Sequence, residues 1–448
     1  MIRLRRIQLD EIPTLVAAAQ SARGQLAVVA VSALGLWLSF RWTGLVLALL
    51  LFAVSWEPNR RRGALSVLAA ALCLRALGGY RGCTAIWLIA AAGLFVAALW
   101  LWRLYLPGLR GWPSRRPLLL LHAGTAGVIA ALWACHRLGL AGASTAALIS
   151  LVSELLWRGS YWVKWGVRNR DSRQFSDYLF TLIPFAGHGG VPFGKGAEYV
   201  SRFEARDARE LAAARLRGLQ LLALAAAWRG LLMLLEPAPS MTSLLEAPAV
   251  LPLWERWTVL VVELLRDILA LAGFGHSVVA LYCLAGFRIP RNTDAPLFAT
   301  TILDFWTRYY FYFKELVMDF FFFPAYFRAK GMSPRARTVL ATFAAAFAGN
   351  LYYHLILYAP ELVRDPAQFS RMVSARMVYC ALLATGLSAS FLRALERKSA
   401  AARPWYRQIY GGAAAILFFA LIHIWNFHAP EVTLAQRADA LLSLFSPE

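Results

Sequence analysis

The chain has 448 residues, of which 59% are hydrophobic and only 16% are charged, and its formal net charge is +21. A soluble domain carries about 25% charged residues, so this composition argues against a water-soluble enzyme and predicts an integral membrane protein. The basic residues are dispersed among short connections and form no single patch, which argues against nucleic-acid binding. The five cysteines show no CxxC spacing, so buried free thiols and no metal site are expected.

Apolar runs of membrane length recur along the whole chain and predict an all-α, multi-pass transmembrane helical bundle of about ten spans. Residues 1–25, basic and then amphipathic, are expected to form a cytoplasmic or interfacial segment, and residues 26–448 a single transmembrane domain. The candidate spans lie at about 26–40, 43–56, 64–77, 84–102, 118–135, 138–156, 218–235, 257–284, 338–358, 372–392 and 408–425.

The connections between the first six spans alternate in charge. Arginine and lysine gather at 58–63, 103–116 and 157–173, whereas the segments 40–42, 78–83 and 136–137 are short and nearly neutral. Basic connections of membrane proteins stay on the cytoplasmic side, so the alternation predicts a cytoplasmic N-terminus.

Two segments depart from simple apolar spans. The run from 176 to 200 is interrupted by prolines and glycines, which indicates either a re-entrant or interfacial element or an ordinary loop. The span at 257–284 carries Glu263, Arg266 and Asp267, at spacings that let opposite charges pair on one helical face. A structural ion pair is favoured over a catalytic group at this place.

An aromatic segment from 297 to 327, expected to be irregular, contains a stripe of charges. Asp304, Arg308, Glu315 and Asp319 follow at intervals of four, seven and four residues, so on one helix they would fall within about 60° of each other. Charge is costly against lipid, and the stripe is therefore expected to face a wet or protein-lined interior.

His354 is the best single candidate for chemistry. It lies inside an apolar run, with Asn350 one turn before it and Tyr358 one turn after it, so the three side chains share a helical face. A neutral imidazole can take a proton from a hydroxyl and return it to a leaving group, and an amide can fix its tautomer. The alternative is a structural histidine that a neighbouring helix satisfies.

Four segments combine glycine, proline, aromatic and single polar residues. They are, in order, TLIPFAGHGG at 181–190, then Gly286-Phe287 with Pro290, Asn292 and Pro296, then 304–310 with Asp319 and Pro324, and finally Gly349 to His354. Together they resemble the motifs of the membrane-bound O-acyltransferases, and within them the bacterial members that acylate cell-envelope polymers. The chain differs from that pattern in carrying Tyr310 at the place of a second histidine and Tyr353 at the place of a tryptophan.

The resemblance implies a helical bundle around a tunnel, with its motif-bearing core at 176–358, in the bacterial cytoplasmic membrane. It implies a transferase that moves an acyl group from a thioester donor, acyl-coenzyme A or an acyl carrier protein, to a hydroxyl of an envelope polysaccharide, glycan or lipid. Membrane lipids and other envelope-polymer proteins are implied partners, and no bound cofactor is. His354 would be the general base, assisted by Asn350 and Tyr310. The residues implied to shape the tunnel or bind substrate are Asn292, Asp304, Trp306, Arg308, Asp319 and Tyr358.

One alternative from another class stays open on the sequence. Intramembrane charges and interrupted helices also serve transport, so a non-catalytic or transporter-like protein that handles lipid-linked glycans would use the same stripe.

Overall fold

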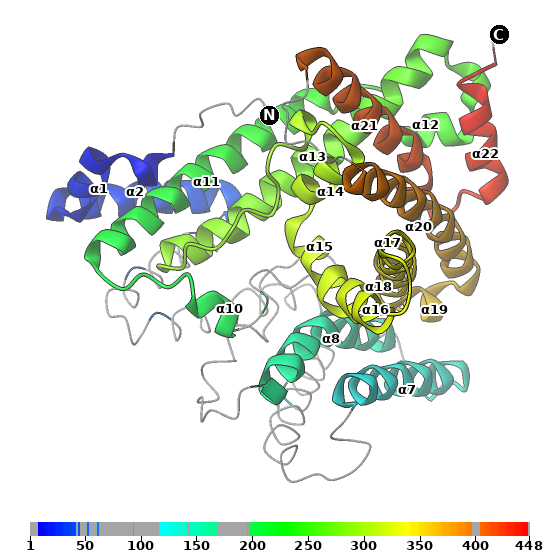
Figure 1. Ribbon diagram of the computed structural model, residues 1–448, viewed down its shortest axis with the longest axis horizontal. Helices are drawn as coiled ribbons and strands as arrows, with labels where there is room; N and C mark the ends of the chain where they lie inside the picture. Colours follow the sequence, from blue (N-terminus) through cyan, green and yellow to red (C-terminus); the bar gives the residue numbers. More distant parts are fainter. Residues whose placement is uncertain are drawn as a thin grey trace. The chain divides into compact units, whose positions relative to one another are not determined.

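The computed structural model describes residues 8–41, 116–140, 144–168, 197–396 and 404–446, together with five single residues at 44, 52, 61, 93 and 195. In these residues all regular secondary structure is helical (Figure 1). One isolated β-bridge joins Glu204 to Phe287. The predicted all-α class is therefore confirmed for the described part of the chain. The expected spans at 43–56, 64–77 and 84–102 lie outside the described residues, as does most of the irregular segment at 176–200.

The chain folds into two compact units. The first, here the N-terminal unit, consists of Arg6–Ala227 and Phe274–Arg291. Its elements are η1 (Leu9–Glu11), α1 (Pro13–Gln20), α2 (Ala22–Phe40), α7 (Pro117–Arg137), α8 (Ser144–Arg168), α10 (Ala197–Ser201), most of α11 (Ala208–Leu235) and the end of α13 (Leu253–Leu284).

The second, here the C-terminal unit, consists of Met1–Arg5, Trp228–Gly273 and Asn292–Glu448. It holds the remaining parts of α11 and α13. Its other elements are α12 (Met241–Glu246), η4 (Pro248–Val250), η5 (Pro296–Phe298), α14 (Ile302–Tyr309), α15 (Phe311–Val317), η6 (Met318–Phe322), α16 (Phe323–Arg328), α17 (Pro334–Phe343), η7 (Ala344–Gly349), α18 (Asn350–Tyr358), α19 (Glu361–Arg364), α20 (Pro366–Leu395), α21 (Trp405–Asn426) and α22 (Leu434–Ser443).

Five helices of the described chain are long and apolar enough to cross a membrane. By length and composition they agree with the spans expected at 118–135, 218–235, 338–358, 372–392 and 408–425, whereas the helices at the spans expected at 138–156 and 257–284 are not among them. The span expected at 26–40 falls in α2, which satisfies these criteria only as a pair with α1, and the two helices are bent by 96°. The five helices are Pro117–Arg137, Ala208–Leu235, Pro334–Tyr358, Pro366–Leu395 and Trp405–Asn426.

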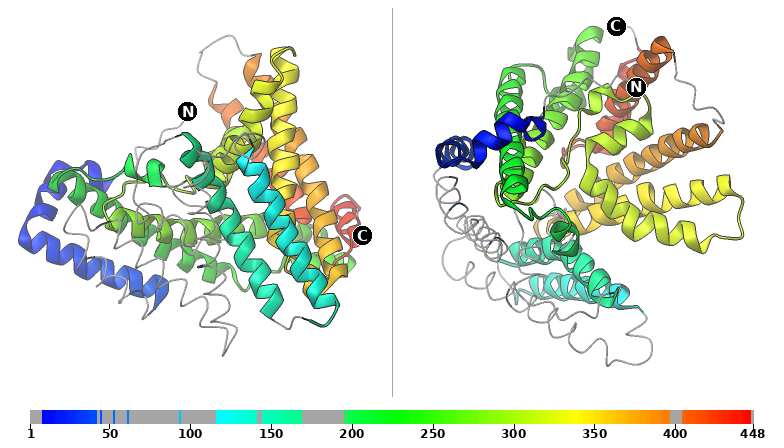
Figure 2. Two further views of the ribbon diagram at one scale, coloured as in Figure 1. Left: turned by 90° about the horizontal axis from the view of Figure 1, so that it is seen from below. Right: turned by 60° about the vertical axis from the view of Figure 1, so that its left-hand side comes forward.

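Helix α8 differs from its prediction. The sequence predicts a span at 138–156 followed by a basic connection at 157–173, but the helix begins at Ser144 and continues to Arg168. Trp157 and Tyr161 are each only 1% exposed, and Ser160 Oγ lies 2.9 Å from His122 Nε2 on α7. Figure 2 shows α7 and α8 side by side. Much of the predicted cytoplasmic connection is therefore a buried helical face.

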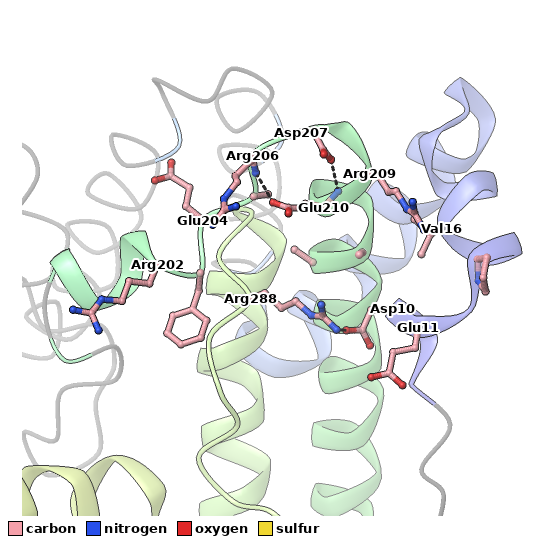
Figure 3. A pocket seen from close by; sticks show the side chains of 15 residues that line it. Asp10, Glu11, Val16, Arg202, Glu204, Arg206, Asp207, Arg209, Glu210 and Arg288 are labelled. Carbon is pink, nitrogen blue, oxygen red and sulfur yellow. Dashed lines mark hydrogen bonds and ion pairs between the residues drawn. The ribbon is translucent and has the colours of Figure 1, made fainter.

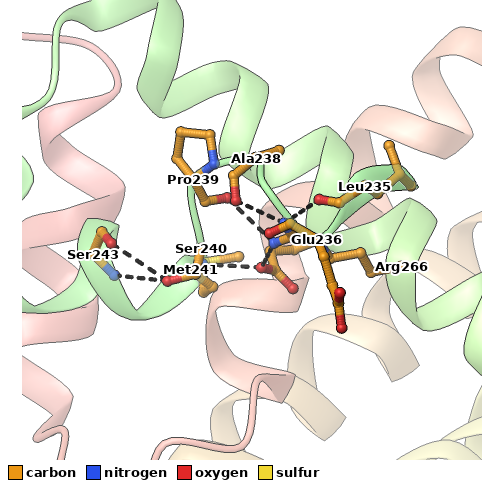
Figure 4. Close-up of polar contacts among 9 residues, drawn as sticks. Leu235, Glu236, Ala238, Pro239, Ser240, Met241, Ser243 and Arg266 are labelled. Carbon is orange, nitrogen blue, oxygen red and sulfur yellow. Dashed lines mark hydrogen bonds and ion pairs between the residues drawn. The ribbon is translucent and has the colours of Figure 1, made fainter. Parts of the chain in front are cut away.

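The ion pair expected in α13 is confirmed, and it has a structural role. The Arg266 guanidinium binds the Glu263 carboxylate and also donates to the carbonyl oxygens of Leu235 and Ala238, at the end of α11 (Figure 4). Glu263 in turn accepts a hydrogen bond from the backbone N–H of Met241 at 3.1 Å. Because a helix end leaves carbonyl groups without intrahelical donors, Arg266 serves as the C-terminal cap of α11.

The helix of the aromatic segment is interrupted at Tyr310, between α14 and α15. Hydrogen bonds to Asn292, which precedes both helices in the sequence, explain the interruption. Asn292 accepts the N–H of Phe311 with its main-chain oxygen at 2.8 Å and the N–H of Tyr312 with Oδ1 at 3.3 Å. These N–H groups would be orphaned at the start of α15. The irregularity expected for 297–327 is confirmed, but the charges at 304–319 do not lie on one continuous helix.

Two π-helical turns, η6 and η7, pack against each other in the C-terminal unit. A π turn holds one more residue than a regular α turn and is often found at functional sites. The backbone of η7 lies close to a side chain of η6: a Cβ added to Gly349 would lie 2.6 Å from the ring of Phe321. The turn η7 leads directly into α18, which carries Asn350 and His354.

We expect Gly349→Ala to lower the free energy of unfolding by about 1–3 kcal/mol, because the new methyl group overpacks the contact with the Phe321 ring. Gly230→Ala on α11 is the matched control, since a Cβ there meets nothing within 4 Å. Denaturant titration of the purified chain in detergent measures both variants. Equal stability of the two would contradict a tight contact between η6 and η7.

Candidate functional site

The predicted helical face of α18 is present, and its polar groups are buried. Asn350 is 1% exposed, and neither its Oδ1 nor its Nδ2 has a hydrogen-bond partner among the described residues. One turn later, the buried Nδ1 of His354 likewise has none. Unsatisfied buried polar groups cost free energy and are rare in native proteins. Other buried polar atoms of the described residues, such as Ser388 Oγ and His423 Nε2, also lack a partner, but Asn350 and His354 lie in successive turns, so one ligand or water between them would satisfy both.

The ring of His354 is held between two tyrosines. Its centroid lies 5.5 Å from that of Tyr358 in a stacked arrangement and 5.6 Å from that of Tyr353 in an edge-on arrangement. The contact with Tyr358 follows from the spacing of four residues on a helix. These contacts fix the plane of the imidazole while leaving Nδ1 without a described partner.

Two residues that the sequence analysis missed complete this region. Arg376 on α20 is 7% exposed and donates from Nε to the Tyr358 hydroxyl at 2.7 Å. The same guanidinium donates from Nη1 to Oδ1 of Asn426 on α21. A series of contacts thus runs from His354 through Tyr358 and Arg376 to Asn426, across three helices of the C-terminal unit. A single arginine inside the apolar run 372–392 was the signal that could have identified it.

Tyr310 belongs to the same aromatic cluster and is joined to His354 by three successive ring contacts. Its ring centroid lies 5.6 Å from that of Phe313, which lies 4.8 Å from that of Tyr353, the neighbour of His354. Trp306 also contacts Phe313, with centroids 5.9 Å apart.

The charged residues predicted for the tunnel have local partners. Arg308 binds Asp304 at 2.7 Å, and Asp304 accepts the backbone N–H of Thr300 at 3.1 Å, so this pair stabilises the start of α14. Asp319 lies in the π turn η6. Asn292 holds the break at Tyr310, and its Nδ2 is buried without a described partner. The structure thus brings Asn350, His354 and Tyr358 together, and places Asp304 and Arg308 in a pair of their own.

Two cavities of the described chain belong to the N-terminal unit. The larger, about 550 Å³, is lined by the ion pair of Asp10 and Arg288 and by the start of α11 (Figure 3). There Glu210 Oε2 accepts the N–H of Arg206 at 2.8 Å, and Asp207 Oδ1 accepts the N–H of Glu210 at 2.8 Å. The smaller, about 240 Å³, has Arg61 and Arg215 in its wall. Neither cavity is lined by His354, so the predicted tunnel stays a prediction.

Comparison with models of known protein families and with curated proteins finds no match for this chain. Its class follows from the fold: the described residues form an all-helical protein with several helices of membrane length, which defines a multi-pass helical membrane protein. The acyltransferase resemblance of the segments between 181 and 354 stays a prediction. Within the described ranges, His, Cys, Asp and Glu form no group of three that could hold a metal ion.

Proposed function

We propose that the chain is a membrane-embedded O-acyltransferase that moves an acyl group from a thioester donor to a hydroxyl of an envelope polysaccharide, glycan or lipid. The observation that carries the proposal is the pair of Asn350 and His354 on one helical face next to a π turn, where both amide atoms of Asn350 and Nδ1 of His354 are buried without a described partner. The order of the motif-like segments between 181 and 354 is a feature of the sequence alone and supports the same proposal.

In the proposed reaction, His354 accepts the proton of the acceptor hydroxyl as its oxygen attacks the thioester carbonyl carbon. The carbon–sulfur bond then breaks, and the thiolate leaves with the proton that His354 returns. Asn350 would hold the imidazole tautomer or the hydroxyl. Tyr310 is a poor base near neutral pH but can donate a hydrogen bond to the oxygen that becomes negative. A site without bulk water strengthens these interactions and protects the thioester from hydrolysis.

The surrounding residues have supporting roles in this proposal. Tyr358 positions the imidazole by stacking on it. Trp306 contacts Phe313, which also contacts Tyr310, so Trp306 supports the position of Tyr310. Asn292 fixes the helix break that presents Tyr310. The proposal extends to Asp304, Arg308 and Asp319 as residues that shape a passage for the reactants.

The proposed location is the bacterial cytoplasmic membrane with a cytoplasmic N-terminus. The donor would be acyl-coenzyme A or an acyl carrier protein on the cytoplasmic side. His354 lies toward the end of its span that the sequence assigns to the outer side, so the acceptor would enter from there. Membrane lipids and other proteins of envelope-polymer synthesis are the proposed partners.

Mass spectrometry of envelope glycans and lipids tests the activity. Cells that produce the chain are expected to carry acyl groups on a glycan or lipid that cells without it lack, and cells with His354→Gln should resemble the latter. If cells with the unmodified chain and cells without it carry the same acyl groups and differ only in the amount of a lipid-linked glycan or in the membrane leaflet that holds it, the transporter-like alternative is correct. If their envelopes are identical, the proposed activity is wrong.

A further inference from the structure

Arg376, like Arg437, is a buried arginine of the C-terminal unit without a carboxylate partner among the described residues, but it donates to side chains and not to main-chain carbonyl oxygens. Arg266 binds a carboxylate, and Arg437 on α22 donates to the carbonyl oxygens of Phe427 and Ala429 beyond the end of α21. The partners of Arg376 are instead the neutral Tyr358 hydroxyl and the Asn426 amide. Within the described ranges, no carboxylate lies at ion-pair distance from Arg376.

Arg376 is buried, and a buried guanidinium is unfavourable without a counter-charge. It carries five N–H donors, and the two described hydrogen bonds start from Nε and Nη1, so the N–H groups of Nη2 are not used by them. A planar fork of this kind matches the oxygen atoms of a phosphate or a carboxylate.

Besides burial, the positive charge of Arg376 lowers the pKa of two groups outside the spans, Arg437 and His428. Burial, and next the charge of Arg376, lower the pKa of Arg437 to about 10. The same two causes, in the same order, lower the pKa of His428, whose ring centroid lies 6.4 Å from that of Tyr358. Arg437 thus places a second cation near Arg376, which favours an incoming anion over a neutral ligand, whereas the carboxylate of Glu361 acts on His428 in the opposite direction.

We propose that Arg376 binds a phosphate or carboxylate group of the molecule that occupies the site of His354, so that the substrate of the chain is an acidic compound. Tyr358 connects the two residues, because its hydroxyl accepts from Arg376 and its ring stacks on His354. The anion bound to Arg376 would thus be separated from the His354 imidazole by the side chain of Tyr358. Calling this molecule a substrate rests on the proposed function, whereas the binding of the anion does not.

Ligand-dependent thermal unfolding of the full chain tests the proposal. The chain in neutral detergent is titrated with glycerol 3-phosphate, with succinate and with neutral glycerol, and the chain in phosphatidylcholine nanodiscs is compared with and without phosphatidylglycerol. A ligand that binds only the folded chain raises its melting temperature. At least one acidic probe, and not glycerol, is expected to do so. Stabilisation by phosphatidylglycerol alone identifies a lipid-borne anion, and stabilisation by a soluble probe identifies a free one.

Variants assign the effect to Arg376. Arg376→Gln should abolish the stabilisation, and Arg376→Lys, which keeps the charge without the fork, should weaken the apparent affinity by about tenfold. Arg393→Gln, at an exposed arginine of the same helix, should bind like the unmodified chain. His354→Gln should also bind, which separates this inference from the proposed activity.

Two results would overturn the proposal. One is that none of the acidic probes stabilises the unmodified chain, and the other is that Arg376→Gln or Arg376→Lys binds the probe as tightly as the unmodified chain does. If Arg376→Gln does not fold, Arg376→Lys alone decides between these outcomes.

Discussion

Replacing His354 by glutamine is expected to lower the rate of acyl transfer by a factor of about 10² to 10⁴, the usual contribution of a positioned general base. Glutamine keeps a polar side chain of similar length but cannot accept and return a proton near neutral pH. The fold should persist, because His354 Nδ1 makes no hydrogen bond to the described residues that the change would break. The measurement is transfer of a radiolabelled acyl group to isolated envelope glycans and lipids by membranes that contain equal amounts of each variant.

Two further variants test whether the loss of acyl transfer is specific to His354. His136→Gln, at the end of α7 in the other unit, should transfer at the unmodified rate. Asn350→Ala should transfer more slowly than the unmodified chain but faster than His354→Gln, because Asn350 orients and does not exchange the proton. Full transfer by His354→Gln in well-folded membranes would rule out His354 as the base.

Arg266→Met is expected to lower the free energy of unfolding by about 3–5 kcal/mol, as when one partner of a buried ion pair is removed. Methionine preserves much of the aliphatic volume, so the loss reports the charge and the hydrogen bonds. The Glu263 carboxylate would stay buried without its cation, and the carbonyl groups of Leu235 and Ala238 would lose their donor. Chemical unfolding of the purified chain in detergent measures the change.

The pair of Arg364 and Glu361 on α19 supplies the control. It has the same three-residue spacing, but the Arg364 side chain is 56% exposed, so Arg364→Met should cost at most about 1 kcal/mol. Adding Glu263→Gln to Arg266→Met should restore part of the stability, because the orphaned charge is removed. An effect of Arg266→Met no larger than that of Arg364→Met would contradict the capping role.

The spans that the sequence predicts well are those whose apolar runs are long and nearly free of charge. The runs at 118–135, 372–392 and 408–425 are of this kind, and each lies within a helix that exceeds it by a few residues. The helix start at Ser333 is also predictable, because a serine before a proline is a capping signal, and Ser333 Oγ does accept the N–H of Ala336.

Other parts of the fold depend on contacts that no local pattern contains. The break at Tyr310 is held by Asn292, and the burial of the basic segment around Trp157 depends on packing in the N-terminal unit. In the candidate site, the helical spacing places Asn350, His354 and Tyr358 on one face. Arg376 and Asn426 join it from helices that follow later in the chain, and only the tertiary structure brings them there.

The π turn η7 holds one residue more than a regular α turn, so the chain can lose a residue there without turning α18. Deleting one alanine from 344–346 would let the turn close as regular α-helix and would leave His354 in its present direction relative to α17. Deleting one residue within α17 would instead rotate every later residue of α18 by about 100° and move it by about 1.5 Å. Related chains are therefore best aligned here with any one-residue gap placed in η7, because a gap placed in α17 would change which side chain occupies the place of the histidine.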